Sequence, residues 1–110
     1  MKRSGSKYGN VKTVVDGIIF DSKKEATRYG VLKLMESGGL IRNLRLQVPY
    51  KIRVNRVHVC TYRADFVYEE KFHNGWKEIV EDTKGVKTPV YNLKKKLMKA
   101  ALGIEIQDWR

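Results

Sequence analysis

The alternation of apolar and polar positions predicts a β-hairpin near the start of the chain. Val11–Val15 and Ile18–Phe20 are rich in β-branched residues, which favour strands. Asp16-Gly17 between them is a pair typical of two-residue hairpin turns. Residues 1–10 show no such pattern, and their serines, glycines and basic residues indicate a flexible basic arm. We therefore expect one folded domain over residues 11–110, preceded by this arm.

Helical spacing replaces the alternation after Phe20. Ser22 followed by Glu25 is a capping box that opens a helix, and Gly38-Gly39 is a typical helix end. The apolar positions between them lie near one stripe, the expected core face of the helix: Ala26, Tyr29, Leu32 and Met35.

Alternation returns between Leu40 and Val59. Leu40–Gln47 is predicted to be a strand or an irregular extended segment. Pro49 then marks either a strand edge or a break, because proline cannot donate to a sheet ladder. Tyr50–Val59 alternates again and is expected to turn near Asn55-Arg56.

Two further strand-like segments flank Asn74-Gly75, a strong signal for a hairpin turn. If these two residues form the turn, Asp65 lies opposite Lys84, and Asp82 lies two residues away on the same strand as Lys84. Opposite residues, and residues two apart, share a face of a sheet. The hairpin therefore groups two carboxylates and an ammonium, provided that the register holds.

The chain closes with a second helix and a short strand. Thr88-Pro89 provides an N-cap and a first-turn proline, and Gly103 is expected to end the helix before a strand over Ile104–Ile106. The predicted order is two strands, helix, three strands, helix, strand. This indicates an α/β fold of the α+β kind, with a central mixed sheet flanked by two helices.

Composition bounds the fold and its surroundings. A chain of 110 residues with 42% hydrophobic residues suits one domain with a modest core. No apolar run approaches the roughly 18 residues of a membrane span, and the basic N-terminal segment lacks the apolar stretch of a secretion signal. With Cys60 as its single cysteine, the chain fits a reducing, cytoplasmic compartment.

The charge balance favours a polyanionic partner. The 23 Lys and Arg residues outnumber the 12 Asp and Glu, which leaves a formal net charge of +11. Nucleic acid is the simplest partner for such an excess. The cationic positions expected to grip a phosphate backbone are Lys94, Lys95, Lys96, Lys99, Arg42 and Arg45.

Asp65, Asp82 and Lys84 suit metal-dependent phosphodiester hydrolysis. Carboxylate oxygens bind Mg²⁺, which activates water and neutralises phosphate, and a lysine can stabilise the developing charge. For Asp82 and Lys84 the competing interpretation is a salt bridge on a solvated surface. For Asp65 it is an ordinary surface strand position, although strands disfavour aspartate.

Two polar residues outside the hairpin have open interpretations. Glu25 is explained by its capping-box role, yet a glutamate on the first helix could also reach a site on the sheet. Gln47 fits either a solvent-facing position or a hydrogen-bonding member of the site. The spacing along the chain decides neither.

The ordered motifs resemble a known group of enzymes. Ala64-Asp65 followed by Asp82-Thr83-Lys84, after a glutamate on a first helix, is similar to the PD-(D/E)xK nuclease superfamily. The segments VDGIIFDSKKEATRY, NLRLQVPYKI, YRADFVYEE, VEDTKG and YNLKKKLM resemble a family of small phage and prophage endodeoxyribonucleases. The resemblance covers the chain from about Lys7 to Ile106.

The resemblance implies a restriction-endonuclease-like fold and a complete site. Mg²⁺ or Mn²⁺ would be bound by Asp65, Asp82 and the main-chain carbonyl of Thr83, with Glu25 completing the site. Lys84 would position the attacking water or stabilise charge, and Gln47 stands where related nucleases often carry a polar residue. Asp82 replaces the commoner glutamate of the motif, and Glu81 beside it could exchange with it after a local distortion.

The expected activity is metal-dependent cleavage of DNA, in a setting of phage recombination or branched-DNA processing in the host cytoplasm. A small domain must pair to cut both strands symmetrically, which favours a homodimer. The alternative hypothesis is a basic nucleic-acid-binding module that keeps the fold without the catalytic activity. A nuclease that acts on RNA is a third hypothesis.

Overall fold

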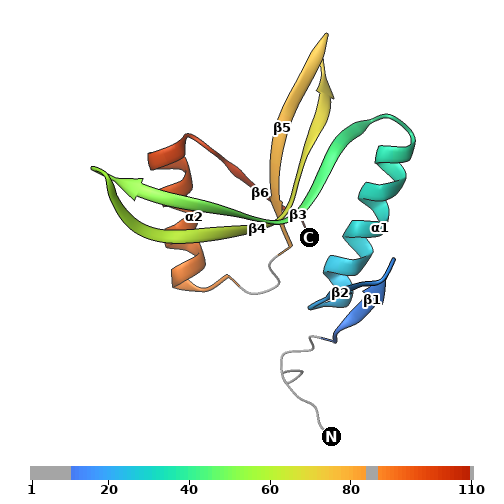
Figure 1. Ribbon diagram of the computed structural model, residues 1–110, viewed down its shortest axis with the longest axis horizontal. Coiled ribbons are helices and arrows are strands. Elements are labelled where there is room, and N and C mark those ends of the chain that lie inside the picture. Colours follow the sequence, from blue (N-terminus) through green and yellow to red (C-terminus); the bar gives the residue numbers. More distant parts are fainter. Residues whose placement is uncertain (1–10, 84–86, 110) are drawn as a thin grey trace, which may run out of the picture.

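The computed structural model of the chain describes residues 11–83 and 87–109 as an α+β fold with two sheets and two helices (Figure 1). This order of elements confirms the one predicted from the sequence. The elements are β1 (Thr13–Val15), β2 (Ile18–Phe20), α1 (Lys23–Ser37), β3 (Ile41–Val54), β4 (Val57–Phe72), β5 (Gly75–Asp82), α2 (Pro89–Leu102) and β6 (Ile106–Asp108).

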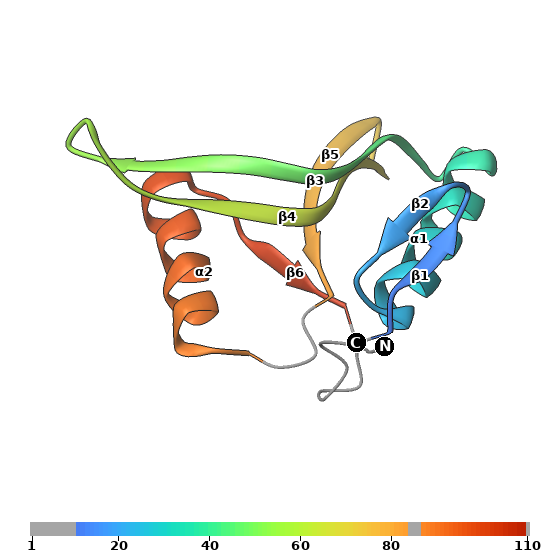
Figure 2. The same cartoon turned by 60° about the horizontal axis from the view of Figure 1, so that its bottom comes forward.

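The central sheet has the strand order β3-β4-β5-β6 and is mixed. β3, β4 and β5 pair antiparallel, whereas β6 runs parallel to β5. The β3–β4 and β4–β5 hairpins point in different directions from a common crossing (Figure 1). Figure 2 shows α2 beneath the β3–β4 hairpin, and α1 with the β1–β2 hairpin on the other side of the crossing.

Two apolar cores lie on either side of this crossing, and β4 contributes to both. The α2 core contains Ile52, Tyr62, Ala64, Val67, Val80, Tyr91, Met98 and Ile106. The α1 core contains Phe20, Ala26, Tyr29, Leu32, Ile41, Phe66 and Tyr68. Residues 64–68 of β4 are all buried, because Ala64 and Val67 enter the α2 core while Phe66 and Tyr68 enter the α1 core. Asp65 therefore lies where the two cores meet.

The helix ends form as the sequence predicts. The hydroxyl of Ser22 accepts a hydrogen bond from the N–H of Glu25 at 3.1 Å, and that of Thr88 accepts one from the N–H of Tyr91 at 3.1 Å. Gly103 takes the left-handed conformation at the end of α2, with a φ of 69°. Neither helix of the described ranges has the length and apolar character needed to cross a membrane.

The β4–β5 turn lies one residue earlier than predicted. Phe72 pairs with Gly75, so the turn residues are His73 and Asn74 rather than Asn74 and Gly75. This register places Val67 opposite Val80, and so joins apolar residues across the strands. The predicted register would have set Val80 against a glutamate of β4.

The observed register shifts each cross-strand partner by two residues, so the same residues still share each face of the hairpin. Phe66 pairs with Glu81, so the continued register sets Asp65 beside Asp82 instead of Lys84. Lys84 itself lies outside the residues that the structure describes.

Two strand boundaries also differ from expectation. β3 continues through Pro49 to the turn at Asn55-Arg56, where both residues have positive φ (52° and 68°), as a tight hairpin turn requires. β3 is an edge strand, so the proline is tolerated there without a break. β6 begins at Ile106 rather than Ile104, because the N–H of Ile104 donates to the Met98 carbonyl at the end of α2.

Asp108 anchors α2 to the edge of the sheet. Its Oδ2 accepts hydrogen bonds from Lys87 at 3.0 Å and Lys95 at 2.5 Å, and its Oδ1 accepts one from the Tyr91 hydroxyl at 2.6 Å. Burial by itself favours the neutral acid, but the hydrogen bonds from Lys95, Tyr91 and Lys87 outweigh it. Together they hold the pKa of Asp108 well below its ordinary value of 3.8.

Met98 and Leu93 provide a matched test of the α2 core. Met98 is fully buried, whereas Leu93 on the same helix is 58% exposed. Met98→Ala should lower the free energy of unfolding by about 2–5 kcal/mol, because it leaves a cavity. Leu93→Ala should change it by no more than about 0.5 kcal/mol. Urea denaturation of both variants measures the difference, and equal losses would contradict this packing of α2.

The lowered pKa of Asp108 predicts a pH-dependent contribution to stability. A carboxylate whose folded pKa is depressed stabilises the fold above its unfolded pKa and loses this effect as pH falls through the folded value. Asp108→Asn should therefore destabilise the protein near neutral pH, and its deficit relative to the native chain should shrink below about pH 4. Denaturation curves from pH 7 to pH 2 measure the deficit. A deficit that stays constant over this range would contradict the role given to the charge.

Candidate active site

Asp65 connects three strands at the crossing. Its Oδ2 accepts hydrogen bonds from the main-chain N–H of Thr83 at 3.0 Å and from the Thr83 hydroxyl at 2.9 Å. Its Oδ1 accepts one from Nε2 of Gln47 at 3.2 Å. The carboxylate is thus held from β3 on one side and from the end of β5 on the other. Asp65 is buried, with 9% of its surface exposed.

Gln47 brings Glu25 to the same site. Its Nε2 donates to Oε2 of Glu25 at 3.0 Å while also donating to Asp65. An amide nitrogen carries two hydrogens, so one can serve each carboxylate. These two carboxylate oxygens, from α1 and β4, therefore lie within two hydrogen-bond lengths of each other.

The backbone at Gln47 has an unusual conformation. Its φ of 52° lies in the left-handed region, which a non-glycine residue rarely adopts inside a strand. Such a conformation costs about 1–3 kcal/mol and persists only where surrounding contacts hold it. The guanidinium of Arg63 donates to the Gln47 carbonyl at 3.3 Å, which is one such contact. Gln47 is nevertheless solvent-exposed, so it lies at the surface beside the two buried carboxylates.

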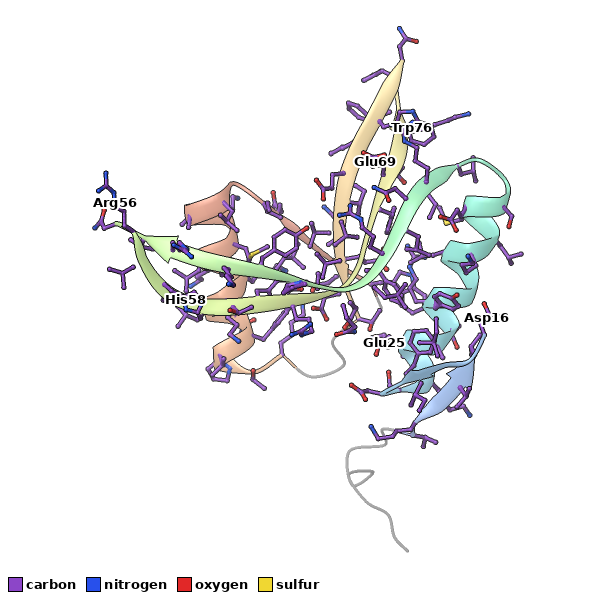
Figure 3. All side chains as sticks on the ribbon, in the orientation of Figure 1. Asp16, Glu25, Arg56, His58, Glu69 and Trp76 are labelled. Atoms are coloured by element: carbon purple, nitrogen blue, oxygen red, sulfur yellow. The ribbon has the colours of Figure 1, made fainter. Side chains whose placement is uncertain are left out.

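Glu25 takes part in both the cap of α1 and the polar contacts at the sheet. Its main-chain N–H takes the Ser22 cap, and its side chain contacts Gln47. The cap fixes the first turn of α1, and this turn aims the carboxylate at the sheet. Figure 3 shows Glu25 on the side of α1 that faces the crossing.

Asp82 is held on the α2 side of the sheet. It is completely buried, and its Oδ2 accepts a short hydrogen bond from the Tyr62 hydroxyl. Burial, strengthened by the hydrogen bond to Asp82, raises the pKa of Tyr62 far above its ordinary value. The sequence marked Tyr62 only as packing, and no local signal distinguished it from the neighbouring aromatic residues.

The four predicted metal ligands are not assembled as one cage of carboxylates. Among residues 11–83 and 87–109, no three side chains of His, Cys, Asp or Glu converge closely enough to hold a metal ion. Glu25 and Asp65 meet through Gln47, whereas Asp82 contacts Tyr62. Thr83 supports Asp65 through its N–H and hydroxyl, and ligation by its carbonyl stays a prediction.

Glu81 faces away from Asp82 and belongs to a buried ion pair. Arg28 donates to its two oxygens from Nε at 2.6 Å and Nη2 at 2.8 Å, and the Tyr68 hydroxyl donates at 2.6 Å. The hydrogen bond with Glu81 raises the pKa of the Arg28 guanidinium. Arg28 also lies 5.2 Å from the centre of the Trp109 ring. Glu81 is therefore occupied on the α1 side.

No local pattern along the chain marked Arg28 as the partner of Glu81, because the two residues lie 53 positions apart. Their pairing depends on the packing of α1 against the sheet, which no local pattern reports.

The predicted DNA contacts fall into two separate regions. Arg42 and Arg45 lie along the β4–β5 hairpin and form ion pairs with Glu69 at 2.6 Å and Glu78 at 3.4 Å. Arg42 also packs 4.2 Å from the centre of the Trp76 ring. These two glutamates offset the positive charge of the arginines that were predicted to contact DNA.

On α2, two of the four lysines make contacts that hold the helix against the sheet. Lys94 donates to the Thr61 carbonyl at 3.0 Å, and Lys95 pairs with Asp108. Lys96 and Lys99 are exposed, and Lys99 lies 3.8 Å from Glu105. An open pocket of about 340 Å³ lies beside them, lined by Asn92, Lys95, Lys96, Lys99, Glu105 and Ile106. The two exposed lysines thus remain candidates for phosphate contact.

Two glutamates of β5 allow a matched test of the buried ion pair. The side chain of Glu81 is 3% exposed and that of Glu78 is 53% exposed, and each pairs with an arginine. Glu81→Gln should lower the free energy of unfolding by about 3–5 kcal/mol, because the largely buried Arg28 is left without its counter-charge. Glu78→Gln should lower it by at most about 1 kcal/mol. Thermal and urea denaturation compare them, and a small effect of Glu81→Gln would count against this pair.

Comparison with known proteins places the chain in a family. No curated protein and no solved structure matches it. A family model does match, over residues 5–107, which includes both helices, the strands β1 to β5, the first two residues of β6 and every residue of the candidate site. The chain belongs to the family described as "Protein of unknown function (DUF1064)".

Proposed function

We propose that the protein is a metal-dependent phosphodiester hydrolase that acts on DNA. The observation that supports this most directly is the bridging amide of Gln47, which gathers Glu25 and Asp65 from different elements. The family description assigns no activity, so the likeness to PD-(D/E)xK nucleases is part of the proposal.

Clustered carboxylates are unfavourable without a compensating charge. Bringing two of them together in a partly buried place adds repulsion to the desolvation of each. A structural protein of net charge +11 has little need for such a cluster, whereas a cation-binding site requires it. Because Gln47 is exposed, a small ion would reach the adjoining carboxylates from this side.

The available donors fit Mg²⁺ or Mn²⁺. Mg²⁺ prefers hard oxygen ligands and usually takes one or two carboxylates, with waters and substrate oxygens filling its remaining positions. Asp65 and Glu25 supply such oxygens, and Asp82 and Thr83 adjoin them at the end of β5. When bound, the ion would lower the pKa of a water molecule and offset the charge of the phosphate.

The protein's own residues orient this chemistry. Thr83 holds one oxygen of Asp65 with two hydrogen bonds, and Gln47 sets the separation of Asp65 from Glu25. Lys84, adjacent to Thr83 in the sequence, is the group we assign to stabilising the charge that develops on the phosphate. A homodimer and a role in recombination are extensions of the same proposal.

Nicking of supercoiled plasmid in the presence of Mg²⁺ or Mn²⁺ tests the proposal. Asp65→Asn should reduce nicking to the level of the metal-free reaction, because the variant loses a charged ligand. Lys84→Ala should slow it by about 100-fold or more. Calorimetric titration with Mn²⁺ should show weaker binding to Asp65→Asn than to the native chain.

Two exposed residues supply controls of the same chemical type. Glu70→Gln changes a carboxylate on the same strand as Asp65, and Lys77→Ala removes an exposed lysine from β5. Both should nick at the native rate. Nicking that persists in Asp65→Asn and Lys84→Ala would refute the site. Binding of DNA without nicking, on plasmid and branched substrates with either metal, would identify a binding module instead.

A further inference from the structure

In the distal part of the β3–β4 hairpin, residues 48–64, lysines and arginines have no acidic counterparts. Residues 48–64 include four cationic side chains and no aspartate or glutamate. The cationic residues are Lys51, Arg53, Arg56 and Arg63, and all four are exposed. The other 93 residues hold all 12 carboxylates of Asp and Glu, so the hairpin stands apart from the rest of the chain.

The strand pairing places the exposed cations on the face that points away from α2. Tyr50, Ile52 and Tyr62 pack in the α2 core, so the residues that alternate with them face outward. Along the outer face, Lys51 pairs with Thr61, and Pro49 pairs with Arg63. The outer face therefore carries the positive charge of Arg63 near its base and that of Lys51 near its middle.

A β-bulge extends this face towards the tip. The register shifts between Ile52 and Arg53, which sets Arg53 opposite His58. His58 Nε2 lies 3.0 Å from the Thr61 hydroxyl, which confirms that both side chains lie on the outer face. Figure 3 shows His58 along the hairpin and Arg56 at its tip. Without the shift His58 would face the α2 side.

The base of the outer face meets the candidate site. Arg63 donates to the carbonyl of Gln47, and the side chain of Gln47 contacts Asp65 and Glu25. A chain of phosphates lying along the hairpin would therefore lead directly to the carboxylates.

The β4–β5 hairpin lacks this character. Residues 69–79 contain three glutamates and two lysines, and Glu69 and Glu78 pair with arginines of β3. It projects from the same crossing and serves as an internal comparison (Figure 1).

We propose that the outer face of the β3–β4 hairpin is the surface on which duplex DNA docks. A two-stranded ribbon has its strands about 4.8 Å apart, and the major groove, about 12 Å wide, admits such a ribbon. This inference rests on the proposed function in taking DNA as the substrate.

Charge reversal on the two hairpins tests the proposal. Lys51→Glu with Arg53→Glu alters the β3–β4 hairpin, and Lys71→Glu with Lys77→Glu makes the same change of charge on the β4–β5 hairpin. All four residues are exposed, so neither pair removes core packing. Binding to a short fluorescent duplex is measured in EDTA over a range of salt concentrations, and thermal denaturation confirms folding.

The first double variant should bind at least about tenfold more weakly, and the slope of log affinity against log salt should fall by about 0.9 for each lost phosphate contact. The second should bind almost as the native chain does. Equal losses in both variants, or no loss in the first, would overturn the proposal. Tighter binding of the native chain to single-stranded RNA than to duplex DNA would also overturn it.

The outcome separates this inference from the proposed function. Weaker binding by the first variant, in a native chain that nicks no plasmid with either metal, would support the docking surface and refute the hydrolase. Native nicking that continues at the same rate in the first variant would refute the docking surface and leave the hydrolase standing.

Discussion

The pairing of β4 with both β3 and β5 is the constraint on which the rest of the structure depends. Residues 64–68 of β4 are buried without interruption, because Ala64 and Val67 enter the α2 core while Phe66 and Tyr68 enter the α1 core. A one-residue slip in register would move each side chain of the strand to the opposite face of the sheet, so Phe66 and Val67 would leave their cores. Asp65 lies within this stretch, so the packing of both cores determines its position.

The polar residues near the crossing are distributed among distinct partners. Glu81 pairs with Arg28 on the α1 side, and Asp82 contacts Tyr62 on the α2 side. Asp65 lies between them and is bonded by neutral donors of Gln47 and Thr83. The ion pair on the α1 side is suited to fixing α1 against the sheet, whereas Asp65 and its neutral donors form the part of the crossing that we propose as a cation site.

The two hairpins differ in charge as clearly as they do in direction. Glu69 and Glu78 pair with arginines where β3 meets the β4–β5 hairpin, while the distal part of the β3–β4 hairpin, residues 48–64, has cationic side chains and no aspartate or glutamate. The net charge of +11 is therefore unevenly distributed over the molecule. This distribution matters more for recognition than the total does, because interactions between exposed charges are screened within about 10 Å at ordinary salt concentrations.

Local patterns in the sequence determined the order of elements and most of their limits. Alternation, the caps at Ser22 and Thr88 and the turn at Asn55-Arg56 each depend on residues close together in the chain, so they can be read in one dimension. The same patterns singled out Glu25, Gln47 and Asp65 as candidates. They left open whether the three side chains meet.

Only the tertiary structure decided that question. The turn at His73-Asn74 follows from cross-strand pairing of Val67 with Val80, which outweighs the local preference for Asn-Gly. The Arg28–Glu81 pair and the contact of Tyr62 with Asp82 require α1 and two strands to pack at one crossing. Gln47 joins Glu25, 22 positions away, to Asp65, 18 positions away, through a backbone conformation that local preference disfavours. Such contacts depend on how the sheet twists between two cores, and that information is spread over the whole chain.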